Sequence, residues 1–145
     1  MKEYLSEFKN IILSTFVNSH HEYFMEETRI GEFDDENGNN IIIVVFSREG
    51  SIPHLHFYRG KKVPPKGIGG GCIKLKEPEF FKHGTHQDKL NPRDVKLLVE
   101  FLKQPYSKLP KITNWEFVVI LWNANNHTWA MPPDSKIPDY LNELR

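Results

Sequence analysis

Residues 27–76 carry their hydrophobic positions in patterns typical of β-strands. The run 41–46 is apolar at every position, which is typical of a strand covered on both faces. Asn37 and Gly38 precede this run, and Asn-Gly is a strong signal for a hairpin turn. An antiparallel meander is therefore predicted, with strands over residues 27–33, 41–47, 51–59 and 72–76.

Helical spacing of apolar residues predicts three helices. The first covers residues 2–17 and is amphipathic. The second begins at Asn91 and Pro92, an N-cap followed by a proline at the first helical position. The third begins at the capping box formed by Thr113 and Glu116 and continues to about residue 123, although residues 117–120 also fit a strand.

These elements predict one α+β domain over residues 1–145. In the predicted arrangement, the N-terminal helix packs on an antiparallel sheet of about four strands. Two further helices and an extended tail follow.

The amino-acid composition limits the classes of protein to which this chain could belong. The chain has 19 Lys and Arg residues and 19 Asp and Glu residues, so its net charge does not indicate a nucleic-acid-binding surface. Its only cysteine, Cys72, excludes an internal disulfide and fits a reducing cytoplasm. The longest apolar runs have six residues, whereas a membrane helix needs about 20, and the N-terminus lacks the apolar core of a secretion signal. We therefore expect a cytoplasmic protein that does not enter membranes.

The predicted strand at 51–59 carries the candidate chemistry. Alternation places Leu55 and Phe57 on the core face, and His54, His56 and Tyr58 on the other face. Two histidines at positions i and i+2 of a strand suit a metal ion, a phosphate or a proton relay, so all three polar residues are catalytic candidates. The alternative is a one-sided sheet whose solvated face carries histidines without a special role.

Two more histidines, His83 and His86, follow in an irregular segment. If they returned to the same face, the four side chains His54, His56, His83 and His86 would be candidate ligands of a divalent metal ion, the one cofactor that we consider. Zinc bound by four histidines is an unusual set, because structural zinc sites usually contain cysteine.

The segment 60–71 is rich in glycine and contains Lys61, Lys62 and Lys66. A basic, glycine-rich loop can bind a phosphate group through its backbone amides, so these lysines are candidate ligand-binding residues. The Walker pattern is absent, and an ordinary loop beside the histidine strand is the alternative.

The segment Pro53, His54, Leu55, His56, Phe57 is followed by Gly60. It resembles the Pro-His-Phe-His hallmark of a family of small bacterial proteins of unknown function, and the likeness extends over about residues 41–123. The resemblance implies a bacterial cytoplasmic protein with a protein partner, in a gene pair of the toxin–antitoxin type. It implies no catalytic mechanism.

Two functions from different classes follow. The first is a small binding or interaction module that contacts a protein partner or a second copy of the chain, because no complete catalytic motif is present and several aromatic residues are expected at the surface: Tyr58, Tyr106, Trp129 and Tyr140. The second is a metal- or histidine-dependent hydrolase or phosphodiesterase that uses His54 and His56. A cysteine nucleophile ranks third, because Cys72 lies inside a predicted strand and not at a helix N-terminus. Whether the protein is an enzyme stays open.

Overall fold

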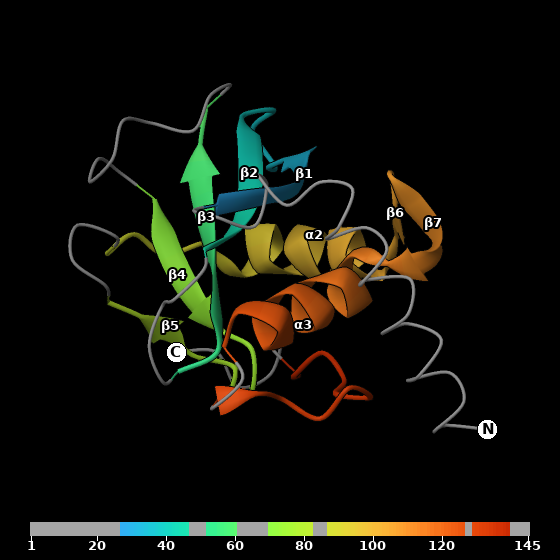
Figure 1. The fold of residues 1–145 in the computed structure, drawn as a ribbon. Coiled ribbons are helices and arrows are strands. Elements are labelled where there is room, and N and C mark those ends of the chain that lie inside the picture. The colour runs from blue at the N-terminus through green and yellow to red at the C-terminus, as the bar shows by residue number, and fades with distance from the viewer. Residues whose placement is uncertain (1–26, 47–51, 61–69, 83–86, 127–128, 140–145) are drawn as a thin grey trace.

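The computed structural model describes residues 27–46, 52–60, 70–82, 87–126 and 129–139 (Figure 1). Five strands form one antiparallel sheet in the order of the sequence. They are β1 (Glu27–Asp34), β2 (Asn40–Phe46), β3 (His54–Arg59), β4 (Gly71–Lys74) and β5 (Phe80–Phe81). The helices α2 (Pro92–Lys103) and α3 (Asn114–Asn125) follow, separated by a hairpin of β6 (Pro105–Tyr106) and β7 (Leu109–Thr113).

Strand β2 lies between β1 and β3 and is covered on both faces, as its apolar sequence predicts. Ile41, Ile43 and Val45 belong to the main hydrophobic core. Ile42 and Val44 point to the opposite face and form a second buried cluster with Tyr58 and Phe46. The sheet therefore has two buried faces at this strand.

Both described helices begin where their capping residues predict. The Asn91 side chain accepts a hydrogen bond from the Asp94 backbone N–H at 2.8 Å, and Pro92 is the first helical residue of α2. At α3 the capping box is complete, because the Thr113 hydroxyl accepts from the Glu116 N–H and the Glu116 carboxylate accepts from the Thr113 N–H. The residues 117–120, which also fitted a strand, are helical.

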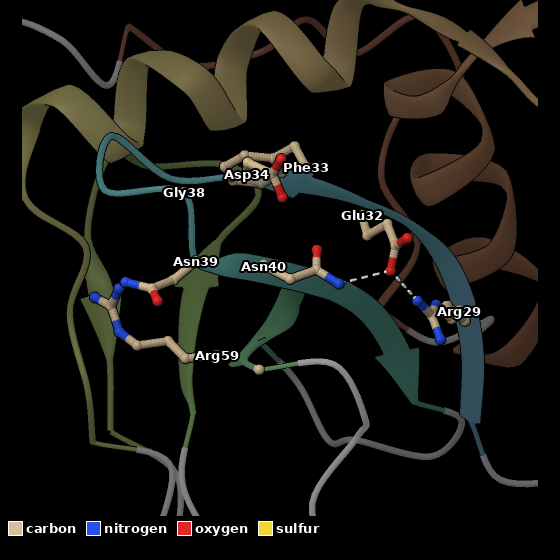
Figure 2. Close-up of a pocket in the computed structure, with 9 residues that line it drawn as sticks. Arg29, Glu32, Phe33, Asp34, Gly38, Asn39, Asn40 and Arg59 are labelled. Carbon is tan, nitrogen blue, oxygen red and sulfur yellow. Dashed lines mark hydrogen bonds and ion pairs between the residues drawn. The ribbon is translucent and has the colours of Figure 1, made fainter.

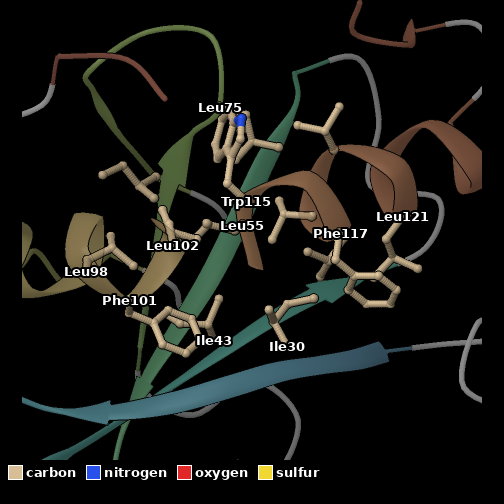
Figure 3. Packing of buried hydrophobic residues seen from close by; sticks show 14 of the residues in the cluster. Ile30, Ile43, Leu55, Leu75, Leu98, Phe101, Leu102, Trp115, Phe117 and Leu121 are labelled. Carbon is tan, nitrogen blue, oxygen red and sulfur yellow. The ribbon is translucent and has the colours of Figure 1, made fainter. Parts of the chain in front are cut away.

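The two helices cover one face of the sheet (Figure 3). From α2, Leu98, Phe101 and Leu102 reach this core, and α3 adds Trp115, Phe117 and Leu121. They meet the inward-facing side chains of the strands, which include Ile30, Ile43 and Leu55. Because α3 is buried nearly all round, it lies at the centre of the core.

The predicted fold is wrong in its sheet architecture. The main sheet has five strands where about four were expected, and a second, two-stranded sheet, which was not predicted, lies between α2 and α3 in the sequence. Strand β5 has two residues, too few to produce a period in the sequence. Pro105 and Pro110 lie in this second sheet, because proline is tolerated in the exposed strands of a two-stranded ribbon.

The other fold predictions have mixed outcomes. The helix predicted over residues 2–17, which was to pack on the sheet, lies outside the described residues, and both helices described come after the sheet. Residues 129–139 contain no α-helix or strand, as expected for an extended tail. Side chains of α3 hold this segment, because the indole N–H groups of Trp115 and Trp122 donate to the carbonyls of Ser135 and Trp129.

In the part of the chain that the structure describes, neither helix has the length and apolar character that crossing a membrane requires.

Candidate metal centre

The pairing of β3 with β4 places a cysteine beside the histidines. His56 is directly opposite Cys72, and His54 is opposite Lys74. Residues opposite each other in an antiparallel pair project to the same face, so the sulfur and both imidazoles share the face that carries Tyr58. This is the face opposite Leu55 and Phe57, and the ring of His54, at the start of β3, also contacts Trp122 of α3.

The three side chains converge on one point. The Nε2 atoms of His54 and His56 are 3.2 Å apart. The Cys72 sulfur lies 3.4 Å from His56 Nδ1 and 3.9 Å from His56 Nε2. One potential donor atom from each residue lies within 4.8 Å of the other two, and among the described residues no other set of three His, Cys, Asp or Glu side chains does this.

The His54 ring is oriented by the backbone just before β3. Its Nδ1 lies 2.6 Å from the carbonyl oxygen of Ile52. A carbonyl can only accept, so Nδ1 carries the proton, and in the neutral ring Nε2 presents its lone pair to His56. Metal-binding histidines use this arrangement, in which the second ring nitrogen donates to a carbonyl and fixes the tautomer.

Aromatic rings surround the cluster. The Phe46 ring is 4.5 Å from that of His56 between centroids. The Phe81 and Trp122 rings lie 4.9 Å and 5.6 Å from the ring of His54. His54 and His56 are each 1% exposed, and Cys72 is fully buried. The donor atoms are therefore shielded from water, and electrostatic interactions with an ion are stronger there than in bulk water.

The spacing of the donors suits a small transition-metal ion. Tetrahedral zinc, with its usual bond lengths to nitrogen and sulfur, separates two nitrogens by about 3.3 Å and a nitrogen from a sulfur by about 3.6 Å. The observed separations are 3.2 Å between the two Nε2 atoms and 3.9 Å between the sulfur and His56 Nε2. Small rotations of the side chains would bring all three donors to one ion.

The alternative of a solvated histidine face is wrong. His54, His56 and Tyr58 lie on the predicted face, but that face is buried, and Tyr58 packs with Ile42 and Val44. Histidine and tyrosine carry both polar and apolar atoms, so the sequence pattern does not separate a solvated face from a second core.

Two expected surface aromatics are also buried. Tyr58 is 4% exposed, and Tyr106 is 1% exposed and stacks on Phe117. Trp129 is exposed, as expected. Tyr140 lies outside the described residues.

Five candidate site residues cannot be placed by the structure. His83, His86, Lys61, Lys62 and Lys66 lie outside the described residues, so their roles as metal or anion ligands stay predictions. Cys72, conversely, was missed as a ligand. Its alternation with Lys74 did indicate a strand, but the register that brings it to His56 depends on how β4 pairs with β3.

A surface cavity of about 970 Å³ lies at the other end of the sheet (Figure 2). Glu32 interacts there with Arg29 and accepts a hydrogen bond from Asn40 at 2.8 Å. The Asn40 hydrogen bond lowers the pKa of Glu32, burial opposes it, and Arg29 lowers it further. The charges of Glu32 and Arg29 compensate each other, so this cavity is a weaker candidate for the functional site than the buried cluster of His54, His56 and Cys72.

No family model matches the chain, and no curated protein or solved structure is significantly similar to it.

Proposed function

We propose that the protein is a small metal-binding module in which His54, His56 and Cys72 hold one transition-metal ion. The observation that carries the proposal is the convergence of two buried imidazole nitrogens and one buried thiol, with His54 oriented by the Ile52 carbonyl. Imidazole and thiolate are the ligands that zinc and copper prefer in proteins.

Burial favours a binding role over hydrolysis. A hydrolase would need its general base or metal-bound water within reach of a substrate. His54 and His56 are each only 1% exposed, and Tyr58, the third catalytic candidate, is 4% exposed. A closed site of this kind is typical of structural metal ions, which add their binding free energy to folding.

A hydrogen-bonded relay without metal is the competing explanation. In a relay, one proton would be shared between the two Nε2 atoms, which are 3.2 Å apart, and Cys72 would donate to His56 Nδ1. Such a network stabilises the core but binds no ion. Metal binding therefore distinguishes the two explanations.

The test uses the full chain purified without a histidine tag and loaded with Co(II), whose thiolate complexes absorb strongly. We expect one equivalent to bind, with a thiolate-to-metal charge-transfer band, and Zn(II) to displace it. Cys72→Ser should abolish the band. His54→Asn should weaken binding strongly while its amide keeps a donor for the Ile52 carbonyl, so that the fold is retained.

The controls separate loss of ligands from loss of fold. Trp129→Ala changes an exposed side chain and should bind like the wild type. His83→Ala and His86→Ala test whether either predicted histidine contributes. If the wild type takes up no metal, or if Cys72→Ser binds as tightly as the wild type, the proposal is wrong and the relay explains the cluster.

The interaction role also stays a prediction. Ile52, 37% exposed, and Trp129, 51% exposed, are the large apolar side chains that the described part of the chain presents to solvent. A metal-stabilised module with a protein partner would be compatible with both the buried cluster and these exposed side chains. Light scattering of the purified chain would test for a homo-oligomer.

A further inference from the structure

The surface cavity beside the β1–β2 turn contains an unsatisfied polar atom. Asn40, the first residue of β2, lines the cavity and donates its side-chain N–H to the Glu32 carboxylate at 2.8 Å. Because a carboxylate only accepts, this contact fixes the amide with its oxygen directed away from Glu32 (Figure 2). Among the residues that the structure describes, this Oδ1 is the one buried side-chain nitrogen or oxygen without a hydrogen-bond partner. A buried acceptor without a donor is costly, so a bound group that donates to it would remove that cost.

The charged groups around this oxygen are acidic overall. Asp34 is directly opposite Asn40 in the β1–β2 ladder, and its exposed side chain lines the same cavity. The groups that line the cavity or contact its arginines are the carboxylates of Glu32, Asp34, Asp35, Asp88 and Asp94 and the guanidinium groups of Arg29 and Arg59. Because the carboxylates outnumber the guanidinium groups, the local potential favours a cation over an anion.

Arg29 occupies the position that a bound cation would take. Its guanidinium pairs with the same Glu32 oxygen, Oε2, that accepts from Asn40. The Arg29 side chain is 46% exposed, so water screens this ion pair and it contributes little to stability. A cationic ligand can therefore replace Arg29 at Glu32 and direct an N–H toward the Asn40 oxygen.

The cavity, with a volume of about 970 Å³, is large enough for a small molecule. We propose that it binds a small organic cation with N–H donors, a primary ammonium or guanidinium compound, held by Glu32, Asp34 and Asn40. The shared requirement is a positive charge that can also donate hydrogen bonds, because both carboxylates and the amide oxygen are acceptors. This binding site is separate from the proposed metal centre, since His54, His56 and Cys72 do not line the cavity.

The experiment uses a pair of dications that differ in their N–H donors. Calorimetry measures the binding of hexamethylenediamine, agmatine and hexamethonium to the full chain. Hexamethonium has the same spacer and charge as hexamethylenediamine, but its quaternary nitrogens cannot donate. Glu32→Gln, Asp34→Asn and Asn40→Ala each remove one proposed acceptor. Glu100→Gln is the matched control, because it removes an exposed carboxylate of α2 that does not line the cavity. Thermal melts verify that each variant is folded.

We expect hexamethylenediamine and agmatine to bind with one equivalent each, and hexamethonium to bind roughly tenfold more weakly. Each of the three acceptor variants should raise the Kd of hexamethylenediamine roughly tenfold, whereas Glu100→Gln should leave it unchanged. Arg29→Ala should lower the Kd, because it removes the guanidinium that competes for Glu32. A variant that only disturbed the fold would not tighten binding.

Several results would overturn the proposal. If neither hexamethylenediamine nor agmatine binds, the cavity is not a site for organic cations. Equal binding of hexamethonium would show that N–H donors, and hence the Asn40 oxygen, are not recognised. If Glu100→Gln weakens binding as much as Asp34→Asn does, the cations are attracted to the negative surface without a specific site.

Discussion

Strand β3 carries a polar cluster near each end, and the two clusters differ in how their groups are satisfied. At the start of the strand, His54 and His56 meet Cys72. At its end, Arg59 lies among Asp35, Asp88 and Asp94, with side-chain contacts of 3.5, 2.9 and 3.8 Å. The Asp35 and Asp94 side chains are each only 2% exposed.

The acidic cluster at Arg59 is complete within the protein. One oxygen of Asp35 accepts the backbone N–H groups of Asn37 and Asn39, and one oxygen of Asp94 accepts that of Glu36. The remaining oxygens face the guanidinium of Arg59. This cluster joins the β1–β2 turn to the N-terminus of α2, and its role is structural.

The histidine cluster is arranged differently, because two ring nitrogens of the same type face each other. Only one of the two Nε2 atoms can carry the shared proton, so a metal ion can replace that proton with little rearrangement. Burial alone therefore does not identify a site. Two electron-pair donors that face each other indicate a metal-binding site. Opposite charges with matched hydrogen bonds instead indicate a structural role.

The largest expected effect comes from the core between the two clusters. Phe57 is fully buried on the helix-facing side of β3, so Phe57→Ala should lower the free energy of unfolding by about 3–5 kcal/mol. Urea denaturation measures this loss. The folded fraction should still bind one metal ion, because Phe57 points away from the cluster. A Phe57→Ala protein that is folded but binds no metal would contradict the separation of the two faces.

The second-largest expected effect is the increase in the free energy of unfolding when the metal ion binds. At a free metal concentration of roughly one hundred times the Kd, the free energy of unfolding of the wild type should rise by about 2.7 kcal/mol. Thermal melts with and without metal measure the increase. Cys72→Ser and His54→Asn should show no increase, whereas Arg59→Ala should show the full increase. Equal stabilisation of all four proteins would mean that the ion binds elsewhere.

The third effect concerns the acidic cluster. Arg59→Ala leaves two buried carboxylates without their cation and should destabilise the protein by about 1–3 kcal/mol, because water partly replaces a side chain that is 37% exposed. The matched control is Arg93→Ala, an 83% exposed arginine paired with Glu36, whose change should stay within about 0.5 kcal/mol. Chemical denaturation compares them, and similar losses for both variants would contradict a structural role of Arg59.

The smallest effect is a dependence on pH. Burial raises the pKa of Asp35, but the N–H groups of Asn39 and Asn37 and the charge of Arg59 outweigh it and lower the pKa below the ordinary 3.8. A lowered carboxyl pKa stabilises the fold above the pKa of the unfolded chain. This contribution is lost as the pH falls from that value through the lower folded pKa. Denaturation at acid pH should show a shallower loss for Asp35→Asn than for the wild type, and parallel losses would contradict this.

The order of residues along the chain was sufficient to predict most of the local elements of this protein. Six apolar residues in a row at 41–46 required an internal strand. The N-caps at Asn91 and Thr113 set where α2 and α3 begin, because the hydrogen bonds of a cap involve neighbours within three residues. Alternation also assigned His54 and His56 to the face opposite Leu55 and Phe57.

Whether that face is exposed to solvent, and which side chains meet on it, depends on contacts between residues far apart in the chain. The sulfur of Cys72 reaches His56 through the β3–β4 register, which joins residues 16 positions apart. The edge strand β5 forms because it pairs with β4, and its Phe81 then closes over His54. Such contacts depend on which strands pair and on what packs against them, and no local pattern of residues encodes either.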